Sequence, residues 1–275
     1  MTERLADISA RIDGIRQLGA VVNALKGIAA ARARTARSEL AAVDSYAKTI
    51  ATAISSSLGP DAPRGSAPSA GRTGLLAFCA EQGFAGAFSE RILDRIGDVD
   101  AKRLLLIGTR GLTVAAQRSL SPGWSAAMPS HTPGIPKLAD AITRAVYSRL
   151  DDNRIDSLDV IHASWIAGRP QIVRRSLLPI DRSDFPPFAG DTPLRQLPAT
   201  ALMASLGADY LHALICKAAL HAFAAENQAR LEAMTSAGSQ IARELEAFQA
   251  VLRRVRQEAI TAEIIELGTG GGQAR

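Results

Sequence analysis

Cysteine and aromatic residues are scarce, and proline is missing from two long stretches. The 275-residue chain has two cysteines, Cys79 and Cys216, which excludes a framework of several disulfides and fits a reducing compartment. Aromatic residues make up 4% of the chain, and none alternates with the arginines at 32–37 or 253–256. Stacking of bases on aromatic rings is therefore not indicated. No proline lies within 3–54 or 199–267, so both stretches can form uninterrupted helices.

Signals for secretion or membrane insertion are also lacking. Met1–Arg4 leads directly into an amphipathic pattern, so we expect no secretory signal. The most apolar stretch, 201–225, contains Asp209, His212 and Lys217, which argues against a membrane span. We expect a soluble protein that acts at a membrane only through a partner.

The net charge of +5 comes largely from arginines near the two ends of the chain. Clustered arginines can indicate nucleic-acid binding, but a solvated or partner-facing surface is the favoured interpretation. The clustered arginines are Arg32, Arg34, Arg37, Arg253, Arg254 and Arg256.

Apolar residues recur at alternating four- and three-residue steps at both ends. This spacing over many heptads is typical of a helix that packs against another helix rather than on a sheet. Gly19 and Lys26 interrupt the first series. The first series is Leu5, Ile8, Ile12, Ile15, Gly19, Val22, Lys26, Ala29, Ala33, Ala36, Leu40, Val43, Ala47, Ile50 and Ile54. The second series is Leu220, Ala224, Asn227, Leu231, Met234, Gly238, Ile241, Leu245, Phe248, Leu252, Val255, Ala259 and Ala262.

Helices of this length do not fit inside a globule made from the same chain. A helix over 3–54 would span roughly 80 Å and one over 198–267 roughly 100 Å. A compact globule of this chain length is about 50 Å across. The pattern therefore predicts two terminal helices paired as a shaft, with a separate domain between them in the sequence.

The middle of the chain alternates between strand and helix patterns, which indicates an open α/β sheet. A run rich in Pro, Gly and Ser predicts a linker before it, and a proline-rich segment over 181–198 follows it. The expected strands are 75–79, 103–108, 158–166 and 172–178, and the expected helices lie before residue 96 and over 136–150.

The sequence offers no catalytic, cofactor or metal site. The glycine-containing turns 83–86 and 108–111 could cradle a phosphate, but neither matches a dinucleotide or Walker pattern, and tight helix packing explains both. The histidines lack metal-ligand spacing and are interpreted as structural or surface residues. Cys79 is expected in a buried strand and Cys216 on a packed helix face. The histidines are His131, His162, His212 and His221.

Several segments together resemble the γ subunit of F-type ATP synthase. The most specific is Arg256–Ile264, similar to the family's Arg-Gln-Ala-Ala-Ile-Thr-Gln-Glu-Leu. Glu81–Ser89 is similar to the family's Asp-Arg-Gly-Leu-Cys-Gly-Gly-Leu-Asn, and Leu177–Pro179 matches its Leu-Leu-Pro. Residues 24–34 and Ala229–Arg230 with Met234 add weaker matches. Departures at residues 25, 27, 81–82, 239–240 and 252–253 suggest a divergent bacterial copy, such as those in sodium-linked ATPase operons.

The resemblance implies the fold and the division of the chain. It implies an antiparallel left-handed coiled coil of the N- and C-terminal helices with an inserted, open, Rossmann-like α/β domain. The expected parts are a first helix over 1–57, a linker over 58–73, the α/β domain over 74–198, a second helix over 199–267 and a flexible tail over 268–275. The residues expected to form the seam between the helices include Ile12, Ile15, Val22, Ile241, Leu245, Phe248 and Leu252.

The same resemblance implies a non-catalytic central-stalk rotor that couples ion-driven rotation of a membrane ring to ATP synthesis or hydrolysis. Its partners would be the α and β subunits of the catalytic head, the ε subunit and the c-ring, at the cytoplasmic face of a bacterial inner membrane. No cofactor, nucleic acid or direct membrane insertion is expected. Arg256 and Gln257 would contact a loop of a β subunit, and Arg253, Arg32 and Arg34 would face acidic segments of β.

Two alternatives stay open at this point. The chain could be an α/β nucleotide-binding enzyme with helical extensions, which would bind a nucleotide at residues 83–86. It could also be a basic helical protein that binds nucleic acid, with steeply salt-dependent affinity.

Overall fold

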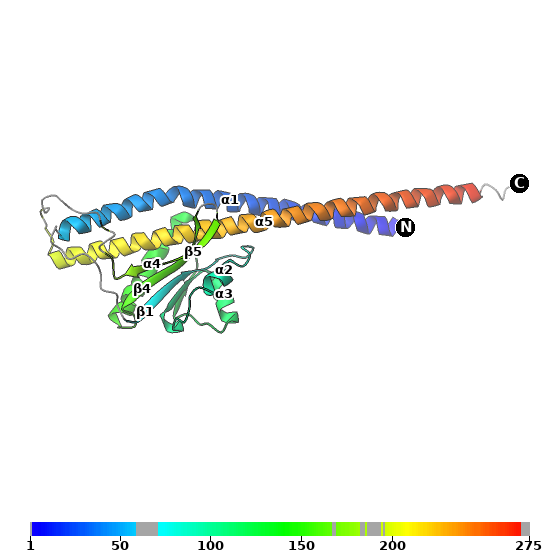
Figure 1. Cartoon of the computed structure of the whole chain (residues 1–275). Coiled ribbons are helices and arrows are strands. Elements are labelled where there is room, and N and C mark those ends of the chain that lie inside the picture. Colours follow the sequence, from blue (N-terminus) through cyan, green and yellow to red (C-terminus); the bar gives the residue numbers. More distant parts are fainter. Residues whose placement is uncertain are drawn as a thin grey trace. The chain divides into compact units, whose positions relative to one another are not determined.

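The chain forms two compact units, which are described separately. The structure is a computed structural model and describes residues 2–58, 71–166, 169–181, 185, 194 and 196–270. One unit comprises Met1–Ile28 and Leu231–Arg275, and the other comprises Ala29–Arg230. Helices α1 (Thr2–Leu58) and α5 (Ala199–Gly270) contribute residues to both units (Figure 1).

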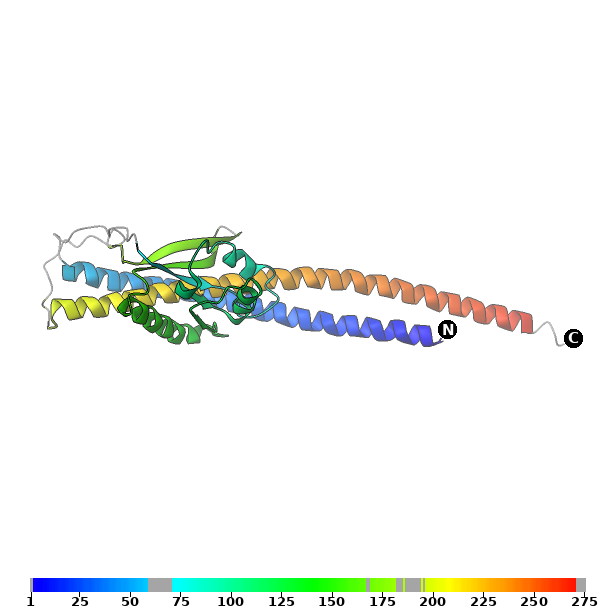
Figure 2. The same ribbon diagram turned by 90° about the horizontal axis from the view of Figure 1, so that it is seen from below.

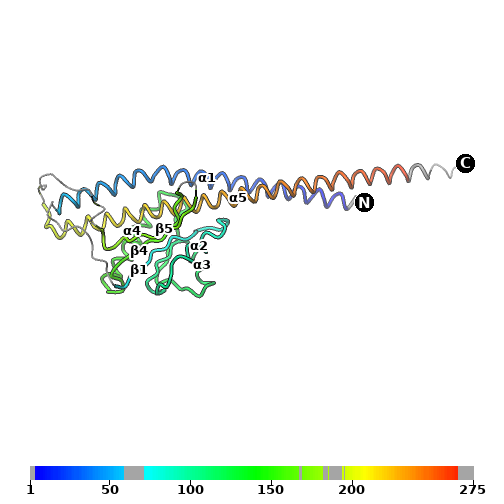
Figure 3. The backbone as a smooth tube through the Cα atoms, in the orientation of Figure 1, coloured from blue at the N-terminus to red at the C-terminus, as the bar shows by residue number. Residues whose placement is uncertain are grey.

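The two long helices follow from composition. Both are rich in alanine and free of proline, so nothing removes a backbone donor or forces a kink along their length. α1 has 57 residues and α5 has 72. In the tube both follow continuous coils (Figure 3). α1 ends at Leu58, where the predicted pattern stops, and the predicted linker that follows lies largely outside the described residues.

In the terminal unit, α1 and α5 run antiparallel and touch along their apolar positions. The guanidinium carbon of Arg11 lies 4.9 Å from the centre of the Phe248 ring. Further along, a Cβ added at Gly19 would lie 3.5 Å from Cγ2 of Ile241. Residues further along α1 therefore contact residues earlier in α5, which shows that the two helices run in opposite directions. α5 continues past the start of α1 in both ribbon views (Figures 1 and 2).

Burial along the helices follows the predicted steps with one exception. Every position of the predicted series on α1 is buried or half-buried except Lys26, which is exposed while the neighbouring Leu25 is half-buried. A lysine at this point therefore extends into solvent, and the neighbouring leucine takes the apolar position. All predicted positions on α5 are buried or half-buried.

The other unit is built on a five-stranded sheet with strand order β3-β2-β1-β4-β5. Strands β1 (Thr73–Phe78), β2 (Leu104–Ile107), β3 (Trp124–Ala126) and β4 (Ser157–Ile166) run parallel to one another. β5 (Arg169–Leu178) pairs with β4 in antiparallel fashion and forms one edge.

Both faces of the central strands are covered, as their continuous apolar runs predict. Leu75 and Ala77 contact one cluster, which includes side chains of α2 (Phe88–Leu93) and α3 (Thr109–Gln117). Leu76 and Phe78 contact the opposite cluster, which includes α4 (Ile135–Asp151) and the parts of α1 and α5 that belong to this unit. Short 3₁₀ turns at Ala101–Arg103 and Thr132–Gly134 precede β2 and α4.

α5 is long and apolar enough to cross a membrane by length and composition alone, over Ala199–Ile265. In this structure its most apolar part is instead core: Leu211, Ile215 and Phe223 are buried in the cluster that covers the sheet. Beyond residue 258, by contrast, Ile260 and Ile264 are 59% and 64% exposed.

The predicted strands and helices of the middle segment are confirmed, with small shifts in their ends. β3 was not predicted, because three residues are too few to show an alternating pattern. Much of the predicted connection over 181–198 lies outside the described residues. α5 continues to Gly270, three residues into the predicted tail, and residues 271–275 are outside the described part.

Replacing Gly111 by alanine should destabilise the protein, because the new Cβ would lie 2.1 Å from Cβ of Cys79. We expect a loss of about 1–3 kcal/mol in the free energy of unfolding, measured in urea. Gly83→Ala is the matched control, since its Cβ would meet nothing within 4 Å. Equal stability of the two variants would show that α3 does not pack this closely on β1.

Candidate functional site

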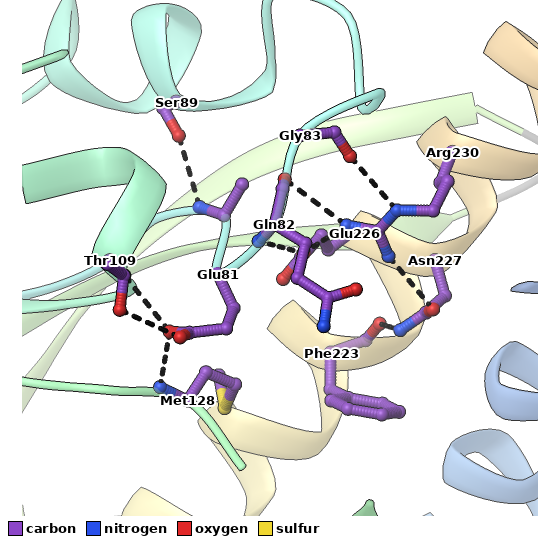
Figure 4. A network of polar contacts seen from close by, with 11 residues as sticks. Glu81, Gln82, Gly83, Ser89, Thr109, Met128, Phe223, Glu226, Asn227 and Arg230 are labelled. Carbon is purple, nitrogen blue, oxygen red and sulfur yellow. Dashed lines mark hydrogen bonds and ion pairs between the residues drawn. The ribbon is translucent and has the colours of Figure 1, made fainter. Parts of the chain in front are cut away.

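The turn after β1 carries a carboxylate, Glu81, that caps a neighbouring helix. Glu81 lies at the N-terminus of α3, where free backbone N–H groups favour an anion. Its carboxylate accepts hydrogen bonds from the backbone N–H of Thr109 at 3.0 Å and the Thr109 hydroxyl at 2.7 Å. It also accepts one from the backbone N–H of Met128 at 2.8 Å (Figure 4).

The glycine turn 108–111 packs directly against the backbone that follows β1. Gly108 has φ +108, and a Cβ there would lie 2.6 Å from the carbonyl oxygen of Cys79. Only glycine fits such an approach. The turn 108–111 therefore serves close packing, whereas a Cβ at Gly83 or Gly86 would meet nothing within 4 Å. Glu81 occupies the N-terminus of α3, where a phosphate bound at the turn 108–111 would lie.

A buried polar network, centred on Arg230, joins the same turn to α5. Arg230 donates from Nη2 to Oε1 of Glu226 at 2.6 Å, and the two side chains are 8% and 4% exposed. Nη2 also donates to the carbonyl oxygen of Gln82 at 3.2 Å, while Nε donates to the carbonyl oxygen of Gly83 and Nη1 to Oδ1 of Asn227, each at 3.1 Å. The backbone N–H of Gln82 donates back to Glu226 at 3.2 Å (Figure 4).

This Arg230 network explains why charged residues occur in the most buried part of α5. Arg230 and Glu226 lie four residues apart on one helix face, and each satisfies backbone groups of the turn as well as its partner. The side-chain N–H of Asn227 donates to the carbonyl oxygen of Phe223 at 2.9 Å. From the sequence, Ala229–Arg230 stands out only as a family match and Glu226 does not stand out at all, because spacing alone does not show which i, i+4 pair is buried.

The predicted seam residues all lie at the less exposed positions of their helices. Ile12 is 3% and Val22 6% exposed, whereas the others are half-buried. Within the terminal unit a groove follows the seam, lined by small residues such as Gly19 and Gly238 together with Arg16 and other polar side chains. The half-buried seam residues are Ile15, Ile241, Leu245, Phe248 and Leu252.

The predicted partner-binding residues lie on the surface. Arg253, Arg256 and Gln257 are exposed on α5 in the terminal unit. Arg34 is exposed and Arg32 is half-buried on α1 in the sheet-containing unit. The side chains of these four arginines form no hydrogen bond or ion pair with the described residues, so their guanidinium groups are available to a partner.

The histidines and cysteines are placed much as expected for structural residues. Burial raises the pKa of the Cys79 thiol to about 12 and that of Cys216 to about 11, which disfavours the reactive thiolate. Burial also lowers the pKa of His162 to about 4. His131 is exposed. No group of histidine, cysteine or acidic residues among the described residues could hold a metal ion.

Breaking the buried ion pair should be costly. Arg230→Met leaves Glu226 as an uncompensated buried charge, and we expect a loss of about 3–5 kcal/mol in the free energy of unfolding in urea. The double variant Glu226→Gln/Arg230→Met should recover part of this loss. Arg118→Met is the control, because its ion pair with Asp94 is exposed and should be worth less than about 1 kcal/mol. A loss as small as that of the control would contradict a buried network.

Acidification should destabilise the fold through His162. An unfolded imidazole has a pKa near 6.5, so below that pH the unfolded state binds more protons than the folded state. Stability is therefore fully present above about pH 6.5 and falls toward about pH 4, by about 2 kcal/mol between pH 7 and pH 5 in chloride buffer. His162→Gln should reduce this pH dependence in urea unfolding and leave only the part due to His221, whose pKa is also lowered by burial, whereas His131→Gln should keep it in full. The same slope in both variants would refute the assignment.

Comparison with known proteins identifies the family. The ATP synthase family model matches residues 4–272. ATP synthase γ chains of Frankia casuarinae and Parafrankia sp. are each 27% identical over all of this chain and 98% of their own length.

Two solved structures share the fold. A chain of the Euglena gracilis mitochondrial ATP synthase rotor in rotational state 1 superposes with a TM-score of 0.62 at 12% identity, over 94% of this chain and 100% of that one. A chain of the Tetrahymena thermophila mitochondrial ATP synthase central stalk and c-ring gives 0.57 at 15% identity, over 79% and 99%. Because the family match extends over nearly the whole sequence, the chain belongs to the ATP synthase family as a γ subunit, the non-catalytic subunit of the central-stalk rotor.

Proposed function

We propose that this chain transmits rotation between an ion-driven c-ring and a catalytic head of α and β subunits, with the ε subunit as a further partner. The observation that carries the proposal is the antiparallel pairing of the first and last helices in the terminal unit. A subunit that transmits torque must resist bending, and a long interhelical seam supplies this resistance.

The finer architecture follows from the same pairing. We propose that the seam is a left-handed coiled coil, because four- and three-residue steps average less than the 3.6 residues of a straight helical turn. The sheet would form a Rossmann-like domain over 74–198, inserted between helices over 1–57 and 199–267, with a linker over 58–73 and a tail from 268. The strand order and the crossover helices support this division.

Contacts with the head are assigned to the exposed polar side chains. Arg256 and Gln257 would contact a loop of a β subunit in some rotary states and release it in others. Arg32, Arg34 and Arg253 would face acidic segments of β, where complementary charge contributes more to specificity than to affinity. The complex would lie at the cytoplasmic face of a bacterial inner membrane, and its divergent, sodium-linked character stays a prediction.

A phosphate at the turn 108–111 is disfavoured, because Glu81 already occupies the N-terminus of α3. At residues 83–86, where the nucleotide-binding alternative placed its ligand, the carbonyl oxygen of Gly83 accepts a hydrogen bond from Arg230. Residues 32–37 and 253–256, where the arginines cluster, contain no aromatic residue that would favour nucleic acid. The rotor is therefore the one function we propose.

Reconstitution with the cognate α and β subunits tests the role directly. The chain should copurify with them in single copy and restore ATP hydrolysis. Leu245→Asp should abolish this recovery, because a charge at a seam position separates the helices. Ala247→Asp is the matched control on the exposed face of α5 and should leave hydrolysis unchanged. Full activity with Leu245→Asp would rule out a seam that matters for coupling.

The β-subunit contact can be tested separately. In the reconstituted complex, Arg256→Ala should lower ATP hydrolysis about five- to tenfold, the effect of losing one charge-assisted hydrogen bond. Arg254→Ala removes a neighbouring exposed arginine and should have little effect. Equal losses in the two variants would contradict a specific contact by Arg256 and would indicate that only the net positive charge of this segment matters.

A further inference from the structure

A cavity of about 260 Å³ lies between α5 and the β4–β5 edge of the sheet, and its polar lining is basic. His162 and Ser164 come from β4, Arg175 from β5, and Lys217 and His221 from α5. None of the described residues that line it is acidic. We call it the basic cavity.

Secondary structure explains why these groups meet. His162 and Ser164 lie two residues apart on β4 and therefore share a face. Arg175 lies opposite Val160 in the antiparallel register, and Val160 belongs to that same face. Lys217 and His221 are four residues apart on α5, so both point from one side of the helix. Neighbouring strands and one helical turn thus bring four basic side chains to one opening.

The two imidazoles form the floor of the cavity. The rings of His162 and His221 are stacked, with centroids 5.6 Å apart and planes inclined by 17°. Nδ1 of His221 lies 3.0 Å from the Ser164 hydroxyl, and Nδ1 of His162 lies 3.2 Å from the carbonyl oxygen of Ala163. The other nitrogen of each ring makes no hydrogen bond within the described part of the chain.

The cationic side chains are at the rim. Nζ of Lys217 lies 2.6 Å from Oδ1 of Asp44, a half-exposed carboxylate on α1 outside the cavity lining. Arg175 is exposed and forms no ion pair with the described residues. The charge of Lys217 is therefore partly balanced by the half-exposed Asp44, whereas that of Arg175 is balanced by no carboxylate among the described residues.

We propose that the basic cavity binds a phosphate-type oxyanion, supplied either as free inorganic phosphate or as a phosphate group of a nucleotide. Arg175 would donate a bidentate pair of hydrogen bonds, Lys217 would supply a second charge, and the Ser164 hydroxyl and the imidazoles would donate from below. The volume suits one tetrahedral anion rather than a whole nucleotide. This site is distinct from the Glu81 turn and from the surfaces proposed for the rotor partners.

Binding should be linked to protonation of the imidazoles. Burial lowers the pKa of both histidines, and Lys217 and Arg175 lower it further. At His162 the Ala163 carbonyl opposes this and His221 adds to it, whereas at His221 Asp44 opposes it. A bound anion offsets the repulsion and favours the protonated rings. Affinity should therefore rise as the pH falls.

The first test is calorimetric titration of the full chain with inorganic phosphate at constant ionic strength. Saturable binding is expected, and Arg175→Gln should weaken it about tenfold. Arg174→Gln is the matched control, because the neighbouring Arg174 is paired with Asp159 at 2.9 Å, and it should bind as the unchanged chain does. Thermal unfolding of both variants verifies that they fold.

Two further arms identify the source of the anion and the role of the histidines. Stronger binding of ADP than of inorganic phosphate assigns the nucleotide, and the reverse order assigns free phosphate. Sulfate, whose charge does not change over the range, should bind at least about threefold more tightly near pH 6 than near pH 8. His221→Gln should remove that dependence. Titration heats no different from those of chloride, or equal losses in the Arg174 and Arg175 variants, would overturn the proposal.

Discussion

Burial of the apolar face of α5 is the interaction on which the rest of the structure depends. From Leu211 to Ala225 this helix is part of the core that covers the sheet, and from Leu231 onward its apolar positions form the seam with α1. The same helix therefore contributes to both units. Arg230, the last residue of the sheet-containing unit, anchors the turn after β1 to the helix.

Glu81 and the basic cavity show how the chain distributes charge around the sheet. At the N-terminus of α3 the chain supplies its own carboxylate, which satisfies backbone donors without a ligand. On the side of β4 that faces α5, basic side chains converge instead. The carboxylate paired with Lys217, Asp44, is half-exposed.

The long helices and the central strands could be predicted from the sequence, because the spacing of apolar residues reflects which positions are buried. The apolar series predicted the buried positions of both long helices, and the continuous runs at 75–79 and 103–108 predicted strands covered on both faces. Lys26 was the exception, since a long side chain can reach solvent while its neighbour Leu25 takes the apolar position. Interactions between distant residues were not accessible. Glu81 with Thr109, and Arg230 with Gly83, depend on loop geometry that no spacing encodes.

The exposed end of α5 has an energetic consequence for the isolated subunit. Ile260 and Ile264 are largely in contact with water there, and full burial of one such side chain would be worth roughly 1.5–3 kcal/mol. An apolar sleeve around this tip would therefore lower the free energy of the chain without any change in its fold. The same surface makes the free subunit prone to self-association at high concentration, a tendency that enclosure by another protein would suppress.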